Sequence, residues 1–244
     1  MPDTPTQTLE FVSDIPNAGE GYVLVKPCVS AEGCGLFLFV EAEEPSDTAP
    51  RKVTDSSYAI PIMNTPRRWK LISSDGERQE TTDLGSHQLA YPEIDLFPDG
   101  RVLLASTRCG HNPEEGNDLN GVVVSPGTGQ QHAFSMGDGI EDCMIDNAGN
   151  IWASYFDEGI YGPDGPANHG LACFNSEGRL VWAHEQSRAS AIIDDCYALN
   201  VAHDATYFYF YSAYHLGRVA SDGSVSTLET GLRGCHHFAI NAKH

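Results

Sequence analysis

Positive charge is scarce in this chain. Only 14 Lys and Arg residues stand against 34 Asp and Glu residues, which gives a formal net charge of −20. A field of this sign repels nucleic acid phosphates and anionic membrane surfaces. We therefore expect no nucleic acid partner. The negative net charge favours solubility. It also attracts cations and cationic ligands rather than anions.

Long apolar runs are also missing. The most apolar stretches, residues 35–40 and 207–211, are far shorter than the ~18 residues that a membrane-spanning helix requires. No membrane insertion is expected. The N-terminus carries Asp3, Glu10 and Asp14 where a secretory signal would have a basic segment followed by an apolar one. These observations predict a cytoplasmic protein.

The sequence lacks a cysteine pattern that would indicate disulfides or a zinc site. The seven cysteines are an odd number and contain no CxxC spacing, which argues against a disulfide framework and against a zinc knuckle. They are predicted to be free thiols, most of them small buried hydrophobic residues. The sequence also contains no nucleophile elbow, phosphate-binding loop or HExxH motif.

Helical periodicity is scarce, and short β-branched and aromatic runs alternate with turn residues instead. The clearest hairpin turns are Asp75-Gly76, Asp99-Gly100, Ala148-Gly149, Glu177-Gly178 and Asp222-Gly223. The chain is therefore predicted to be all-β.

The strands belong to a repeat. Residues 93–106 align with residues 142–155 without a gap, at a period of 49 residues, and looser copies begin at residues 195 and 235. A second series of hairpins falls between these copies. Four strands in each unit of about 50 residues are typical of the blades of a β-propeller, because one blade buries its faces only when neighbours stack on it.

We predict one β-propeller domain over residues 1–244 with about five four-stranded blades. Clear repeats cover residues 91–241, and a divergent first blade covers about residues 21–80, with strand-like runs at 22–26, 35–41 and 58–63. The segment at the end of the chain resembles the first strand of a blade. Either it closes the ring or the chain is an incomplete propeller, and the sequence does not decide between these two interpretations.

The segment 137–152, Gly-Asp-Gly-Ile-Glu-Asp-Cys-Met-Ile-Asp-Asn-Ala-Gly-Asn-Ile-Trp, resembles the repeat of regulator-type sensor propellers. It is also similar to blades of the gluconolactonase, streptogramin-lyase and NHL group. The resemblance covers about residues 91–241 and is specific for the fold rather than for an activity. It implies a divalent metal held by ligands on the inner strands.

One repeat position carries acids in three copies. Glu93, Asp142 and Asp195 stand immediately before the inner strand of successive blades, and His236 falls close to this position in the fourth copy. Carboxylates and an imidazole that converge on a channel suit Ca²⁺, Mg²⁺ or Zn²⁺. The resemblance implies that these four residues are the metal ligands, although Asp142 and Asp195 stand where that group often has Asn. The alternative is that these acids accept hydrogen bonds from backbone N–H groups.

Two long loops, residues 108–117 and 155–170, are candidates for a ligand-binding rim because such loops often line ligand sites. The rim candidates are His111, Asp157, Glu158 and Tyr161. Ordinary solvated loops are the competing interpretation.

Three functions agree with these features. The first is a propeller that binds a small molecule or a protein, and the second is a metal-dependent hydrolase, lactonase or lyase with its site at the central channel. The third is a structural part of a larger assembly, which includes an incomplete propeller.

Overall fold

The computed structural model describes residues 15–42, 66–112, 114, 116–187 and 191–240. These residues form four antiparallel sheets of four strands each and one two-stranded ribbon. The β-propeller prediction is confirmed, and four of the roughly five predicted blades lie within the described residues. The predicted strand at residues 58–63 lies outside them.

The strands follow one another along the chain within each blade. The first blade contains β1 (Tyr22–Val29), β2 (Gly35–Glu41), β3 (Arg67–Ser74) and β4 (Gln79–His87). The second contains β5 (Pro92–Leu96), β6 (Val102–Ser106), β9 (Gly121–Ser125) and β10 (Gln130–Phe134). The third contains β11 (Ile140–Ile145), β12 (Ile151–Tyr155), β13 (Leu171–Phe174) and β14 (Leu180–Ala183). The fourth contains β15 (Asp195–Val201), β16 (Ala205–Tyr211), β17 (His215–Ala220) and β18 (Val225–Glu229).

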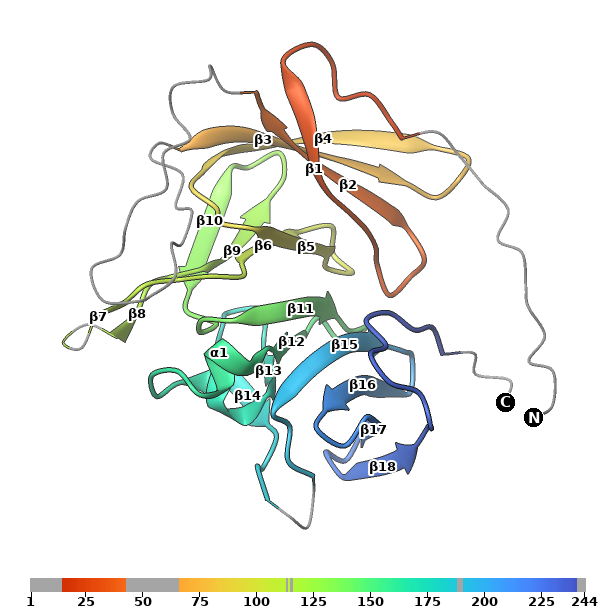
Figure 1. The fold of residues 1–244 in the computed structure, drawn as a ribbon. Helices are drawn as coiled ribbons and strands as arrows, with labels where there is room; N and C mark the ends of the chain where they lie inside the picture. Colours follow the sequence, from red (N-terminus) through yellow and green to blue (C-terminus); the bar gives the residue numbers. More distant parts are fainter. Residues whose placement is uncertain (1–14, 43–65, 113, 115, 188–190, 241–244) are drawn as a thin grey trace.

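The blades stack in sequence order around an arc, from the first sheet at the top of Figure 1 to the fourth at the lower right. Their innermost strands are neighbours, since β1 contacts β5, β5 contacts β11 and β11 contacts β15. Residues on β1, β5, β11 and β15 therefore face a common central region. This arrangement is the one that the repeat predicts.

The blades are held together by apolar side chains between the sheets. One buried cluster joins the first two blades and includes Trp69 and Leu104, both 0% exposed. A larger cluster joins the second, third and fourth blades and includes Phe97, Tyr155 and Phe208. Fully burying one such side chain contributes about 1.5–3 kcal/mol, so these clusters are the main source of stability.

Hydrogen bonds also cross between blades. The buried Asp95 carboxylate on β5 accepts the Ile145 N–H of β11 at 2.7 Å and the Leu96 N–H of its own strand at 2.8 Å. The Arg108 guanidinium donates two hydrogen bonds to the Asp138 carboxylate at 3.0 and 3.1 Å. Such a two-point contact fixes both the distance and the orientation of the segments that it joins.

The connecting segments differ from simple turns at two places. The loop after β12 contains a four-residue helix, α1 (Asp157–Ile160), and a 3₁₀ turn, η1 (Pro166–His169), and the loop after β6 contains the ribbon β7 (His111–Asn112) and β8 (Gly116–Asn117). All seven cysteines are free, as predicted. No helix in the described residues is long and apolar enough to cross a membrane.

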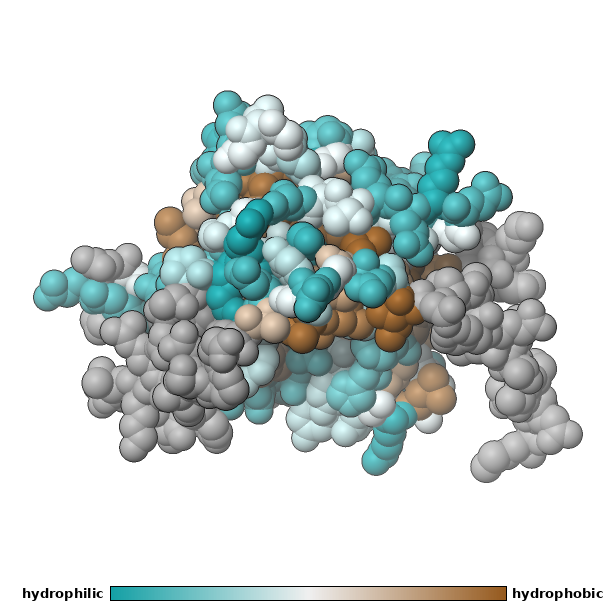
Figure 2. Space-filling view, turned by 90° about the horizontal axis from the view of Figure 1, so that it is seen from above, coloured by the Kyte–Doolittle hydropathy of each residue, from teal (hydrophilic) through white to brown (hydrophobic). Residues whose placement is uncertain are grey.

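The outer surface of the first blade is mixed in character. Seen from above, apolar patches lie among polar side chains (Figure 2). On β1, every second residue is exposed, and these include Val23, Val25 and Val29. Residues 235–240, which the repeat predicts as the inner strand of a further blade, form no strand in the structure.

Candidate functional site

A cavity of about 800 Å³ lies where the inner strands meet. Its walls come from β1, β5, β11 and β15 and from the segment after β18. The polar residues that line it are Lys26, Ser30, Glu93, Asp95, Glu141, Asp142, Tyr197, Asn200, His203, His236 and His237. The cavity therefore brings four carboxyl groups, one amine and three imidazoles to one place.

Irregularities in the inner strands turn side chains towards this cavity. The pairing register shifts between Leu24 and Lys26 in β1, between Ile140 and Asp142 in β11, and between Cys196 and Ala198 in β15. A bulge of this kind inserts an unpaired residue and re-aims the side chains next to it. In β11 the bulge lets two consecutive acids, Glu141 and Asp142, both line the cavity.

An ion pair occupies one wall of the cavity. The Lys26 Nζ atom lies 2.5 Å from Oε1 of Glu93, and the two side chains are 31% and 9% exposed. Burial raises the pKa of Glu93 more than Lys26 lowers it. At Lys26 burial acts to lower the pKa, but the charges of Glu93 and Asp142 outweigh it and raise the pKa. Lys26 therefore stays charged beside these acids.

Asp142 is the least compensated acid in the cavity. Burial and, to a smaller extent, the neighbouring Glu93 carboxylate raise its pKa to about 7, against the opposing effect of Lys26. The pKa of Glu141 is also raised, chiefly by burial, and the nearby His236 acts against this rise. A carboxyl group with a pKa close to 7 can exchange a proton near neutral pH, and it is stabilised by any positive charge brought close to it.

Another part of the lining is aromatic. The rings of Tyr197 and His236 are stacked, with centroids 5.0 Å apart and an angle of 25° between the planes. The Asn200 side chain donates a hydrogen bond to the Phe238 carbonyl at 3.4 Å, which holds residues 235–240 beside β15. The cavity thus combines a charged wall with a flat aromatic one.

The four predicted metal ligands do not form a ligand set in this arrangement. Glu93, Asp142 and His236 line the cavity, as expected, but Asp195 does not, and Glu93 is held by Lys26. Within the described part of the chain, no group of three or more His, Cys, Asp or Glu side chains is placed to hold a metal ion. The four residues are not gathered into such a group, and their role as metal ligands stays a prediction.

Asp195 lies at the start of β15, nearer to the helical loop. Burial and, to a smaller extent, the charges of Asp157 and Glu141 raise its pKa to about 7. Its Oδ1 atom is buried and has no hydrogen-bond partner. Asp195 is therefore an acid with a buried oxygen that accepts no hydrogen bond, and it is not among the residues that line the cavity.

The four rim candidates are engaged in local contacts. Glu158 accepts a hydrogen bond from Arg108 at 2.6 Å, and the Tyr161 hydroxyl donates one to Asp194. The His111 ring contacts Asn117 at 2.9 Å, and the Asp157 carboxylate accepts the Glu158 N–H at 2.7 Å. These contacts shape the loops, and whether the rim binds a ligand stays a prediction.

Sequence reasoning missed Lys26 and Tyr197. Lys26 lies in the first blade, which does not align with the other repeats, and Tyr197 lies at a bulge that the repeat does not reveal. The only signal for Lys26 is that it is the one cation in the strand-like run 22–29, and its position beside Glu93 needs the stacking of the blades.

No protein-family model and no curated protein matches the sequence. Among solved structures, a catalytically inactive virginiamycin B lyase from Staphylococcus aureus with quinupristin is 10% identical with a TM-score of 0.46, covering 92% of this chain and 75% of that one. A streptogramin B lyase is 12% identical with a TM-score of 0.43, covering 85% and 68%. Regucalcin from Agrobacterium tumefaciens, a calcium-binding protein, is 12% identical with a TM-score of 0.42, covering 78% and only 53%. These likenesses agree with the predicted resemblance and concern the fold alone.

Proposed function

We propose that this protein is a ligand-binding β-propeller, and that its central cavity binds a small organic molecule with a positive charge next to an apolar or aromatic part. The observation that supports this proposal is the balance of charge in the cavity. Glu93, Glu141 and Asp142 line it, and Lys26 is the one Lys or Arg in the lining, while His236 and His237 act on Glu141. A fourth acid, Asp95, already has its oxygens bound to backbone N–H groups.

The aromatic wall supports the second half of the proposal. A ligand cation placed next to Asp142 would lower the pKa of that carboxyl and gain a charge-assisted hydrogen bond, which contributes about 1.5–3 kcal/mol. The stacked Tyr197 and His236 rings offer a flat surface for the rest of the ligand.

The test compares 2-phenylethylamine with 2-phenylethanol, two molecules that differ in charge and hardly in shape. Calorimetric titration at pH 7.5 should show that the amine binds at least about 10-fold more tightly, the equivalent of one charge-assisted hydrogen bond. Asp142→Asn should remove this preference, whereas Glu77→Gln, at an exposed turn carboxyl, should keep it. Equal binding of the two compounds, or no binding of either, would reject this ligand class.

A second candidate function, hydrolysis or lyase chemistry in the same cavity, is favoured by one specific observation. Asp142 has a pKa of about 7 and faces the cavity, which are the properties of a general acid–base group. A panel of lactones and esters, assayed with wild type and with Asp142→Asn, would test it. A parallel assay in EDTA would separate activity that depends on a metal from activity that depends on Asp142 alone.

A further inference from the structure

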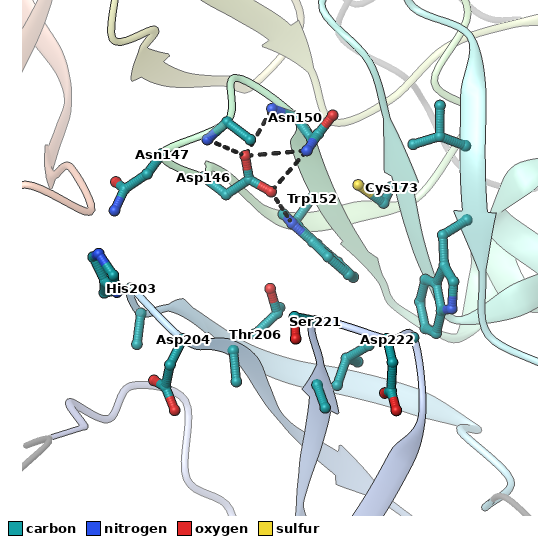
Figure 3. A pocket seen from close by; sticks show the side chains of 18 residues that line it. Asp146, Asn147, Asn150, Trp152, Cys173, His203, Asp204, Thr206, Ser221 and Asp222 are labelled. Atoms are coloured by element: carbon teal, nitrogen blue, oxygen red, sulfur yellow. Dashed lines mark hydrogen bonds between the residues drawn. The ribbon is translucent and has the colours of Figure 1, made fainter.

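A second cavity, of about 690 Å³, lies between the third and fourth blades (Figure 3). On one side are Asp146 and Trp152 of the third blade, and on the other are Thr206 and Ser221 of the fourth. Trp182 on β14 of the third blade also lines the cavity. We call this cavity the inter-blade cleft. Ala202 and His203 line both the cleft and the central cavity, but Trp152 and Trp182 line the cleft and not the central cavity.

The corresponding junction between the second and third blades is closed. There Phe97, 3% exposed, fills the gap and lies 3.8 Å from the position that a Gly149 Cβ would take. The His132 ring donates a hydrogen bond from Nε2 to the Glu177 carbonyl at 2.8 Å, across the junction. The buried Phe97 ring therefore fills that junction, and the His132 N–H there has a hydrogen-bond acceptor.

The repeat places different residues at these positions in the next junction. Asp146 stands where the second blade has Phe97, at the period of 49 residues, and Trp182 stands where it has His132, as the strand pairing shows. The Asp146 carboxylate does not fill the gap, because it accepts hydrogen bonds from its own turn, at Ala148 and Asn150. The junction is left open.

The floor of the cleft is a rigid pair of indole rings. Trp152 and Trp182 have ring centroids 5.3 Å apart at an angle of 49°. The Trp152 Nε1–H donates to Asp146 Oδ2 at 3.1 Å, which fixes that ring. Trp182 Nε1 has no hydrogen-bond acceptor among the described residues, and the neighbouring Gly223 has no side chain to cover it. The cleft thus offers an aromatic surface and one free N–H donor.

The charge around the cleft limits what can enter. Its lining contains three carboxylates, Asp146, Asp204 and Asp222, and no Lys or Arg, and one of the three, Asp204, has the Arg218 guanidinium 3.4 Å away. An anionic ligand would be repelled, whereas a neutral or cationic one would not. Small side chains from the fourth blade, such as Ala205 and Ala220, leave room for a flat group above the indoles.

We propose that the inter-blade cleft is a binding site for a flat aromatic heterocycle that carries a hydrogen-bond acceptor and no negative charge. The ligand ring packs on Trp152 and Trp182, and its acceptor takes the free N–H of Trp182. This site is independent of the function proposed for the central cavity. Nothing in its chemistry involves Glu93 or Asp142.

The chain contains only three tryptophans, which makes the test direct. Quinoline, which is neutral at pH 7 and has a ring nitrogen acceptor, is titrated into ¹⁵N-labelled protein while the three indole N–H signals are recorded. The Trp182 signal should move most. The Trp69 signal should stay in place, because that indole is fully buried and donates to the His87 carbonyl at 3.0 Å. Quinoline-4-carboxylate should bind at least about 10-fold more weakly.

Two variants separate the role of the Trp182 N–H donor from that of the free space in the cleft. Trp182→Phe keeps a ring and removes the N–H, and should weaken quinoline binding about 2- to 10-fold, as expected for one hydrogen bond. Ala220→Leu fills the space above the indoles and keeps both tryptophans, and should weaken binding at least about 5-fold. The same change at exposed Ala213 is the matched control and should have no effect.

The result that would overturn the proposal is a Trp182 signal that does not move, or three indole signals that move equally. Equal binding of quinoline and its carboxylate would also overturn it, since the lining acids would then play no part. Asp142→Asn should leave quinoline binding unchanged, so this test and the test of the central cavity fail independently.

Discussion

Asp95 should make this protein more stable at mildly acidic pH than at alkaline pH. Asp95 is only 2% exposed. Burial raises its pKa to about 7, although the N–H groups of Ile145 and Leu96 act against this rise. In the unfolded chain an aspartate has a pKa of about 3.9. The folded state therefore binds a proton on Asp95 over a range of pH in which the unfolded state does not.

The sign and the size follow from this difference in pKa. A group whose pKa is raised by folding contributes stability that is fully present below the unfolded pKa and is lost as the pH rises through the folded one. For pKa values of about 7 and 3.9, the contribution of Asp95 should be about 2–3 kcal/mol larger at pH 5 than at pH 8. Asparagine does not titrate, so Asp95→Asn removes this contribution. It also leaves one of the two backbone N–H groups without an acceptor, at a cost of about 1–3 kcal/mol at every pH.

Urea unfolding at pH 5, 6, 7 and 8, followed by circular dichroism, measures the effect. The free energy of unfolding of wild type should fall by about 2–3 kcal/mol more than that of Asp95→Asn between pH 5 and pH 8. Other titrating groups, such as buried His184, are present in both proteins and cancel in this comparison.

Asp99→Asn is the control. Slight desolvation of Asp99 is outweighed by hydrogen bonds from Arg101, so its pKa is lowered, and its removal should alter the pH dependence slightly in the opposite direction. The same pH dependence in wild type and in Asp95→Asn would refute the reasoning, because Asp95 would then have to titrate alike in the folded and unfolded states.

Two further predictions concern the contacts between blades. Gly178→Ala should cost about 3 kcal/mol or more in a urea melt, because the residue has a φ of +76° and a Cβ there would lie 2.1 Å from the Phe134 ring. Gly127→Ala, with a φ of +81° and open space around it, should cost only about 1 kcal/mol, and similar losses would contradict the role of the contact. Asn120→Ala should cost about 2–4 kcal/mol, because this 4% exposed side chain makes three hydrogen bonds to backbone groups. Exposed Asn147→Ala should change thermal stability by less than about 0.5 kcal/mol, and equal effects of the two changes would argue against the hydrogen-bond explanation.

The repeat made part of the central cavity predictable. An ungapped period of 49 residues means that Glu93 and Asp142 occupy the same place in successive blades, and both line the cavity. The glycine turns were predictable for a similar reason, because the positive φ of residues such as Gly100 and Gly149 is a local requirement of each hairpin. Features that repeat or that depend on neighbours along the chain can be read from the sequence.

Asp195 shows where this reasoning fails. The alignment treats it as equivalent to Asp142, but the bulge in β11 precedes Asp142, whereas the bulge in β15 follows Cys196. Because side chains alternate between the two faces of a strand, a bulge on one side of an acid rather than the other changes the face on which that acid lies. Asp195 therefore does not line the cavity. A bulge carries no signal in the residue types of this repeat, so its position had to come from the structure.

Lys26 explains why the charge in the cavity differs from the sequence expectation. Carboxylates that converge in a buried region need a cation, and the sequence offers a bound metal as one way to supply it. The structure supplies a positive charge from the chain itself, since Lys26 lies 2.5 Å from Glu93. An ammonium on a flexible stem offsets only part of the acid, and Asp142 keeps a pKa of about 7. The proposal of a cationic ligand rests on this remaining acid, and therefore on the position of Lys26, a residue that the repeat could not place.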